Sequence, residues 1–196
     1  MRVKKDLYIL RMEKYGINIK VTIIIYNIMG NMTFYDSIAP GYKELYEGEQ
    51  AQKLKKITTL VPTSGGKMLD IGAGTCLASK FFDHEYFAIE PSKKLIEYSK
   101  HVANIPKDNI VIGDDWLLQK LKGKYDLIIA VTSAHHFIDI NNAVKHIKRI
   151  LSLNGYVVIS VLTSSQKNID IKNALSTQFQ VDITVTPKET YYVCQR

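Results

Sequence analysis

Residues 67–76 read KMLDIGAGTC, and this stretch decides the fold that the sequence predicts. An apolar segment, 68–71, contains the acid Asp70 and breaks into a turn with glycines at positions 72 and 74. Glycine admits backbone angles that a side chain disfavours and lets backbone N–H groups approach a ligand closely. In α/β proteins, a turn of this kind at the end of the first strand binds a nucleotide-like ligand. The stretch therefore predicts an α/β domain with a cofactor of that kind.

Outward from this stretch, apolar segments alternate with helical patterns. Strands are expected at 68–71, 86–90, 109–113, 125–131 and 156–162. Helices are expected at 42–60, 75–82, 92–102, 141–151 and 165–178, with Ser92 as an N-cap and Asn154-Gly155 as a turn into the fifth strand. Residues 179–186 and 189–196 alternate about Pro187-Lys188, which indicates a hairpin. The pattern predicts a doubly wound, Rossmann-like, mostly parallel seven-stranded sheet with a C-terminal antiparallel hairpin and helices on both faces.

Composition narrows the class of protein. The chain has 196 residues, 46% hydrophobic and 23% charged, which suits one globular domain. No apolar segment approaches the roughly 20 residues that span a bilayer, so we expect no membrane span and a cytoplasmic protein. Cys76 and Cys194 lack C-x-x-C spacing, and we expect both to be small structural residues.

The net charge of +7 is unevenly distributed. Residues 1–31 carry six basic and two acidic side chains, more than half of the excess. We expect 1–31 to be a poorly ordered basic extension or a start assigned too early, with a functional arm as the alternative, and 32–196 to be the domain. The charge is therefore weak support for a nucleic-acid substrate. Lys53, Lys55 and Lys56 are expected to form a solvated helix face.

The acids near the turn favour one cofactor over another. Glu90 follows Gly72 by 18 residues, at the end of the second expected strand, where an acid accepts hydrogen bonds from ribose hydroxyls. A dinucleotide fingerprint needs glycine at position 77, but this chain has Leu77. Asp70 would repel a diphosphate, whereas it would attract a ligand that carries a positive amino or sulfonium group. These features favour S-adenosylmethionine over NAD.

A family resemblance agrees with this interpretation. LDIGAGT (69–75), Glu90, Asp114-Asp115-Trp116 and YDLIIAVTSAHHF (125–137) resemble, in this order, the motifs of class I S-adenosylmethionine-dependent methyltransferases. The resemblance covers roughly Met32 to the C-terminus. YDSIAPGY (35–42) is similar to the N-terminal cap of the small-molecule branch that includes quinone-biosynthesis C-methyltransferases. Cys76 departs from the third glycine of many members, at a position that tolerates small residues.

The resemblance implies a cofactor role for each matching residue. The methionine moiety would be held by Asp70 and by the turn of Gly72, Ala73, Gly74 and Thr75. Glu90 would bind the ribose of the adenosine, and Pro91 and Ser92 would line the adenosine beside it. Asp114 would face the adenine amino group, with Asp115 and Trp116 beside the adenine ring. The sulfonium would lie above Val131 and Thr132, and the cap would close over the cofactor with Tyr35 and Tyr42.

His135 and His136 follow the fourth expected strand, where the family binds its acceptor. A histidine could act as a base there because its ordinary pKa is near neutrality. The alternative is that one packs under the loop and the other faces the cleft. Two adjacent histidines without a clustered third ligand fit no zinc spacing, so no metal is expected.

The acceptor is less well defined by sequence. Residues 131–134 read VTSA, where amino-methylating branches of the family often have Asn/Asp-Pro-Pro-Tyr/Phe. This counts against N-methylation of nucleic-acid bases or glutamine. We expect a methyltransferase acting on a small-molecule substrate, as a monomer or homodimer. The alternatives are an RNA or protein acceptor, or a non-catalytic cofactor-binding or regulatory module.

Overall fold

The protein is represented by a computed structural model that describes residues 35–37, 41–102 and 104–196, with the backbone alone for 42–46. The predicted extension, 1–31, lies outside the described residues.

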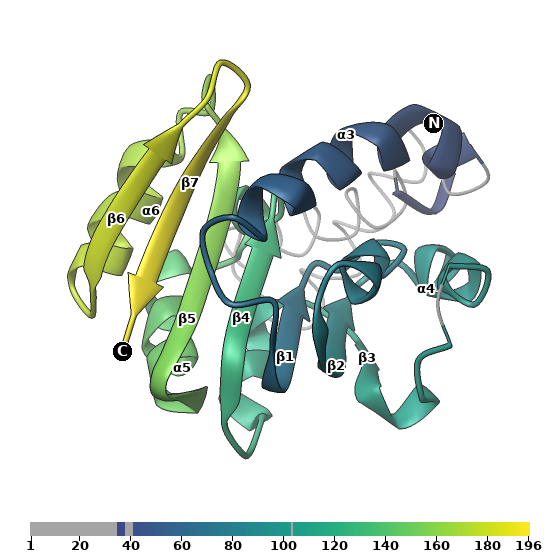
Figure 1. Cartoon of the computed structure of the whole chain (residues 1–196), viewed down its shortest axis with the longest axis horizontal. Helices are drawn as coiled ribbons and strands as arrows, with labels where there is room; N and C mark the ends of the chain where they lie inside the picture. Colours follow the sequence, from purple (N-terminus) through teal and green to yellow (C-terminus); the bar gives the residue numbers. More distant parts are fainter. Residues whose placement is uncertain (1–34, 38–40, 103) are drawn as a thin grey trace, which may run out of the picture.

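Seven strands form one sheet (Figure 1). They are β1 (Ser64–Ile71), β2 (Asp83–Glu90), β3 (Ile110–Ile112), β4 (Tyr125–Val131), β5 (Leu151–Leu162), β6 (Gln180–Val185) and β7 (Glu189–Gln195). Their order is β3-β2-β1-β4-β5-β7-β6. β7 runs antiparallel to both β5 and β6, while the other neighbouring pairs are parallel. The sheet confirms the predicted fold, with the single antiparallel strand next to the edge.

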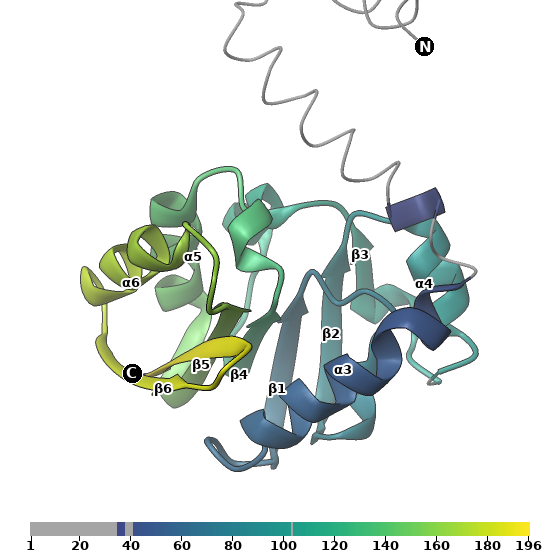
Figure 2. The ribbon, with the colours of Figure 1, turned by 90° about the horizontal axis from the view of Figure 1, so that it is seen from above.

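Helices cover both faces of the sheet (Figures 1 and 2). α3 (Tyr42–Ile57) crosses one face, and α5 (Ile140–Ile150) and α6 (Asn168–Ser176) cover the other. α4 (Lys93–Ser99) follows β2, and residues 35–37 are also helical. Short 3₁₀ helices in the described part of the chain are η2 (Leu77–Lys80), η3 (Lys107–Asn109), η4 (Asp115–Lys120) and η5 (Ala134–His136). None of the helices in the described part of the chain is both long and apolar enough to cross a bilayer.

The central strands supply core residues to both faces. On β4, Ile128 packs into the cluster under α5 and α6, whereas Leu127 and Ile129 pack into the cluster under α3. This alternation is the period of two that a strand imposes, and here both sets are apolar because both faces are covered. Cys76 and Cys194 are buried and free, which agrees with the expected structural roles.

Two local predictions were wrong. The helix expected at 75–82 is only the single turn η2, because the chain before it is not helical: φ is positive at Gly72, Gly74 and Cys76. The turn expected at Asn154-Gly155 lies within β5, where Asn154 has a φ of 64°. Hydrogen bonds to Arg196 at both residues continue the pairing with the chain after β7, so the strand is not interrupted.

Candidate active site

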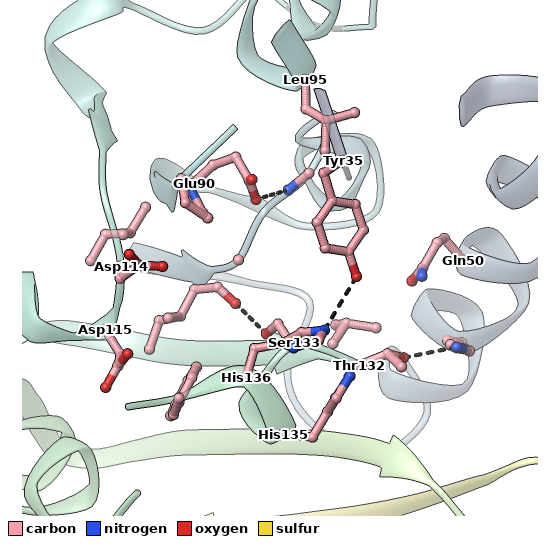
Figure 3. Close-up of a pocket in the computed structure, with 18 of the residues that line it drawn as sticks. Tyr35, Gln50, Glu90, Leu95, Asp114, Asp115, Thr132, Ser133, His135 and His136 are labelled. Atoms are coloured by element: carbon pink, nitrogen blue, oxygen red, sulfur yellow. Dashed lines mark hydrogen bonds between the residues drawn. The ribbon is translucent and has the colours of Figure 1, made fainter. Parts of the chain in front are cut away.

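A cavity of about 420 Å³ opens at the carboxyl ends of the parallel strands (Figure 3). This is where open α/β sheets bind their ligands. The cavity brings together most of the residues predicted from sequence: Tyr35, Gly72, Gly74, Glu90, Pro91, Asp114, Asp115, Val131, Thr132, His135 and His136.

The glycine turn is fixed by the loop that follows β4. Gly72 has a φ of 72°, and a Cβ built on it would lie 2.5 Å from Cβ of Ser133. The Ser133 hydroxyl donates to the carbonyl oxygen of Ile71 at 2.6 Å, so the serine is held against the turn. Only glycine meets both demands at position 72. Ser133 lines the cavity as well, and sequence reasoning did not identify it.

Glu90 lies at the end of β2 with its carboxylate on the cavity. Its Oε2 accepts a hydrogen bond from the Gly74 amide and its Oε1 from the Ser92 amide, each at 2.8 Å. Burial raises the pKa of Glu90 to about 7, against the opposing effect of these two amides. A carboxylate offers about four lone-pair sites, so each oxygen can still accept a ligand hydroxyl.

Asp70 lies beside a second, smaller cavity of about 40 Å³. This cavity shares Gly72, Gly74, Gln50 and Val131 with the larger one, so the two adjoin. Ala73 and Thr75 also line it. The Tyr86 hydroxyl donates to Oδ2 of Asp70 at 2.6 Å. Burial raises the pKa of Asp70 to about 7.

Two acids line the cavity after β3. Oδ1 of Asp115 accepts a hydrogen bond from the Ile138 amide at 3.1 Å, and burial raises its pKa to about 6. Burial also raises the pKa of Asp114. Trp116 does not line the cavity: its side chain is 42% exposed and its ring lies 4.4 Å from the Lys120 ammonium. The expected contact of Trp116 with a bound ring therefore has no counterpart in this geometry.

Ser92 lies behind the cavity rather than on it. As predicted, it is the N-cap of α4, where its hydroxyl accepts a hydrogen bond from the Leu95 amide at 3.2 Å. The same hydroxyl donates to Oδ1 of Asp36 at 2.6 Å. This bond anchors the helical residues 35–37, which carry Tyr35, beside the cavity. The side chain of Tyr42 lies outside the described part of the chain.

The histidine pair forms the opposite end of the cavity from Glu90 (Figure 3). Both rings line it, with their centroids 3.9 Å apart. The Tyr35 hydroxyl lies 3.3 Å from Nε2 of His136. Burial, then the neighbouring His136 and Lys53, lower the pKa of His135 to about 4. Its Nδ1 is buried and has no hydrogen-bond partner among the described residues.

The prediction that Lys53 is solvated was wrong. Its side chain is 6% exposed, and its ammonium pairs with Glu49 at 2.9 Å and with Glu189 at 3.2 Å. It also donates to the Thr132 hydroxyl at 2.8 Å, and that hydroxyl donates to Oε1 of Glu189 at 2.8 Å. The four side chains tie α3 to the ends of β4 and β7. The one available signal was the position of Lys53 beside Leu54 and one turn before Ile57, which are both buried.

A model of the methyltransferase-domain family matches residues 43–183, most of the chain. The chain belongs to this family of class I, S-adenosylmethionine-dependent methyltransferases. An uncharacterized protein of Methanocaldococcus jannaschii is 24% identical to this chain over 153 residues. That match covers 78% of the chain and 59% of the relative, so the chain spans about three-fifths of the relative's length.

Solved structures share the fold of this chain. One is a protein of Methanococcus maripaludis to which S-adenosyl-L-methionine-dependent methyltransferase activity has been attributed, with 19% identity and a TM-score of 0.68 over 84% of this chain and 93% of the other. Another is DhpI in complex with S-adenosylhomocysteine, with 12% identity and a TM-score of 0.66 over 85% of this chain and 95% of the other. At these identities the likeness establishes the fold alone.

Proposed function

We propose that this methyltransferase transfers a methyl group to a small-molecule acceptor that binds beside His135 and His136. The observation that carries the proposal is one continuous cavity with the predicted ribose-binding acid, Glu90, at one end and the histidine pair at the other. Its volume of about 420 Å³ lies in the range of small-molecule sites. A cytoplasmic setting is part of the proposal, since two buried free thiols suit a reducing compartment.

The residues present fit S-adenosylmethionine. Glu90 offers both carboxylate oxygens to ribose hydroxyls, and Asp114 offers an acceptor to an adenine amino group. Asp70 and the glycine turn lie at the adjoining smaller cavity, which suits the methionine end with its positive amino group. The missing side chain at Gly72 lets the ligand approach the backbone between β1 and the Ser133 loop.

When bound, the cofactor supplies an activated methyl group on a sulfonium. The task of the protein is then alignment and exclusion of water, which can contribute most of the rate. Val131 and Thr132 line the cavity at the end of β4, and Tyr35 is anchored beside the cavity through its neighbour Asp36. With its lowered pKa, His135 is neutral at physiological pH. It can therefore accept a hydrogen bond from an acceptor O–H or N–H and orient that atom.

The proposal is tested with methyl-labelled S-adenosylmethionine and an extract of the source cells divided into small-molecule, RNA and protein fractions. We expect label in the small-molecule fraction. Label in RNA or protein would contradict the choice of acceptor class. Cofactor binding by calorimetry, combined with no label in any fraction, would indicate a non-catalytic module instead.

A further inference from the structure

The wall of the cavity carries more negative than positive charge, in contrast to the whole chain with its net charge of +7. Among the described lining residues, the acids are Glu49, Glu90, Asp114 and Asp115, and the one lysine is Lys53. Glu90, Asp114 and Asp115 lie at the proposed cofactor end, where the uncharged ribose and adenine of the bound cofactor would cover them. The charge that an acceptor meets therefore depends on the other end, which we define as Glu49, Lys53, Thr132, His135 and His136.

The positive group in this acceptor end, the Lys53 ammonium, is paired with oxygen atoms of the protein itself. A lysine ammonium has three N–H donors. Lys53 has three acceptors within reach: the Thr132 hydroxyl at 2.8 Å, Glu49 at 2.9 Å and Glu189 at 3.2 Å. With its side chain only 6% exposed, the ammonium is enclosed by these oxygens of the protein and offers little access to a carboxylate or phosphate of a ligand.

Two carboxylates face this one ammonium, which leaves the cluster with a net negative charge. Glu189 is buried behind the wall, while the side chain of Glu49 is 41% exposed and lines the cavity. Lys53, and more weakly the exposed Lys188, lower the pKa of Glu49, so its carboxylate is ionised at neutral pH. Lys188 does not line the cavity, and solvent screens its charge.

The two histidines add no positive charge to the acceptor end. Burial lowers the pKa of both His135 and His136, so both rings are uncharged at neutral pH. Both rings line the cavity and supply polar contacts without charge, and the ring of His136 lies edge-on to Tyr35.

We propose that the acceptor end selects a small molecule without negative charge, uncharged or positively charged, and rejects carboxylated and phosphorylated acceptors. The inference rests on the proposed function and adds the chemical class of the acceptor. Like charges in a partly desolvated cavity repel, whereas a cation is attracted by the same wall. Glu49 is the selecting residue, since its partly exposed carboxylate lines the cavity and shares the one Lys53 ammonium with the buried Glu189.

The first experiment separates the labelled product by charge. The small-molecule fraction is incubated with methyl-labelled cofactor and passed at pH 7 over anion- and cation-exchange resins. We expect the labelled product in the unretained or cation-exchange fraction. A labelled product retained by the anion exchanger would overturn the inference and leave the proposed methyl transfer intact. Absence of any labelled product would remove the proposed function and this inference together.

The second experiment needs no acceptor of known identity. Benzylamine and benzoate, which have similar rings and opposite charges, are titrated into the complex with S-adenosylhomocysteine by NMR. We expect benzylamine to bind roughly 5-fold more tightly than benzoate, a modest ratio because Glu49 is partly exposed. Glu49→Gln keeps an oxygen for Lys53 and should bring this ratio toward one. Glu97→Gln, an exposed change on α4, should leave it unaltered. Tighter binding of benzoate, or a ratio unaffected by Glu49→Gln, would refute the inference.

Discussion

Oε2 of Glu90 lies 2.8 Å from the amide nitrogen of Gly74, so the end of β2 holds the glycine turn that follows β1. The other carboxylate oxygen accepts from the Ser92 amide at the start of α4. One side chain therefore joins the three segments that surround the proposed ribose position.

Glu90→Gln tests this arrangement. A glutamine has one acceptor oxygen, so its NH₂ group must face a backbone N–H, and one charge-assisted contact with the ribose is also lost. We expect the affinity for S-adenosylhomocysteine to fall roughly 10- to 100-fold, the range for losing a hydrogen bond to a charged group. Isothermal calorimetry measures it, with Glu97→Gln as the control. Unchanged affinity in both Glu90→Gln and Glu90→Ala would show that the ribose lies elsewhere.

Asp70→Asn should change the pH dependence of stability. Burial raises the pKa of Asp70 from 3.8 to about 7, so the folded protein holds this proton more tightly than the unfolded chain. Its contribution therefore favours the fold at low pH and is lost as the pH rises from about 4 to about 7. The stability of Asp70→Asn relative to the natural protein should increase by roughly 2 kcal/mol between pH 5 and pH 8. Urea unfolding of the cofactor-free proteins measures the difference, and a difference that stays constant with pH would contradict it.

Lys53→Met should destabilise the protein more than an exposed lysine substitution. It removes the cation from the buried Glu189 and leaves that carboxylate uncompensated, at a cost of about 3–5 kcal/mol. Glu189→Gln in the same chain removes the uncompensated charge, so the double variant should recover much of the loss. Lys55→Met, an exposed change on the same helix, is the control. A double variant no more stable than Lys53→Met would refute the assigned role of Glu189.

Gly72→Ala and Gly48→Ala should have opposite effects. At Gly72, the positive φ and the approach of Ser133 make an added methyl group costly, and we expect a loss of at least about 2 kcal/mol. Gly48 is in α3, and a Cβ added there would have nothing within 4 Å, so alanine should add about 0.5–1 kcal/mol. Thermal unfolding compares the two. Equal effects would indicate that the Ser133 loop moves freely away from the turn.

The features of the fold that depend on the local sequence pattern could be predicted from the sequence. The strand limits at 125–131 and the N-cap at Ser92 follow from apolar periodicity and capping chemistry, and both are found as expected. Lys53 was missed because its partners, Thr132 and Glu189, lie 79 and 136 residues away in sequence. From sequence alone, a lysine on a helix is expected to be solvated, and only the tertiary structure shows which residues surround it. For Trp116, whose contact with the adenine ring stays a prediction, the motif fixes the place of the residue in the chain but not the direction of its ring.

The position of β7 has a consequence for how the protein is made on the ribosome. Strand β7 is the last strand in the sequence, yet it lies between β5 and β6 and carries Glu189. While the chain is being synthesised, β5 therefore has an open edge until β7 emerges, and Lys53 lacks one of its two carboxylates. Because domains fold as units, we expect partly made chains to require protection by chaperones. Proteins arrested before Glu189 should then lack both a stable sheet and a formed cavity.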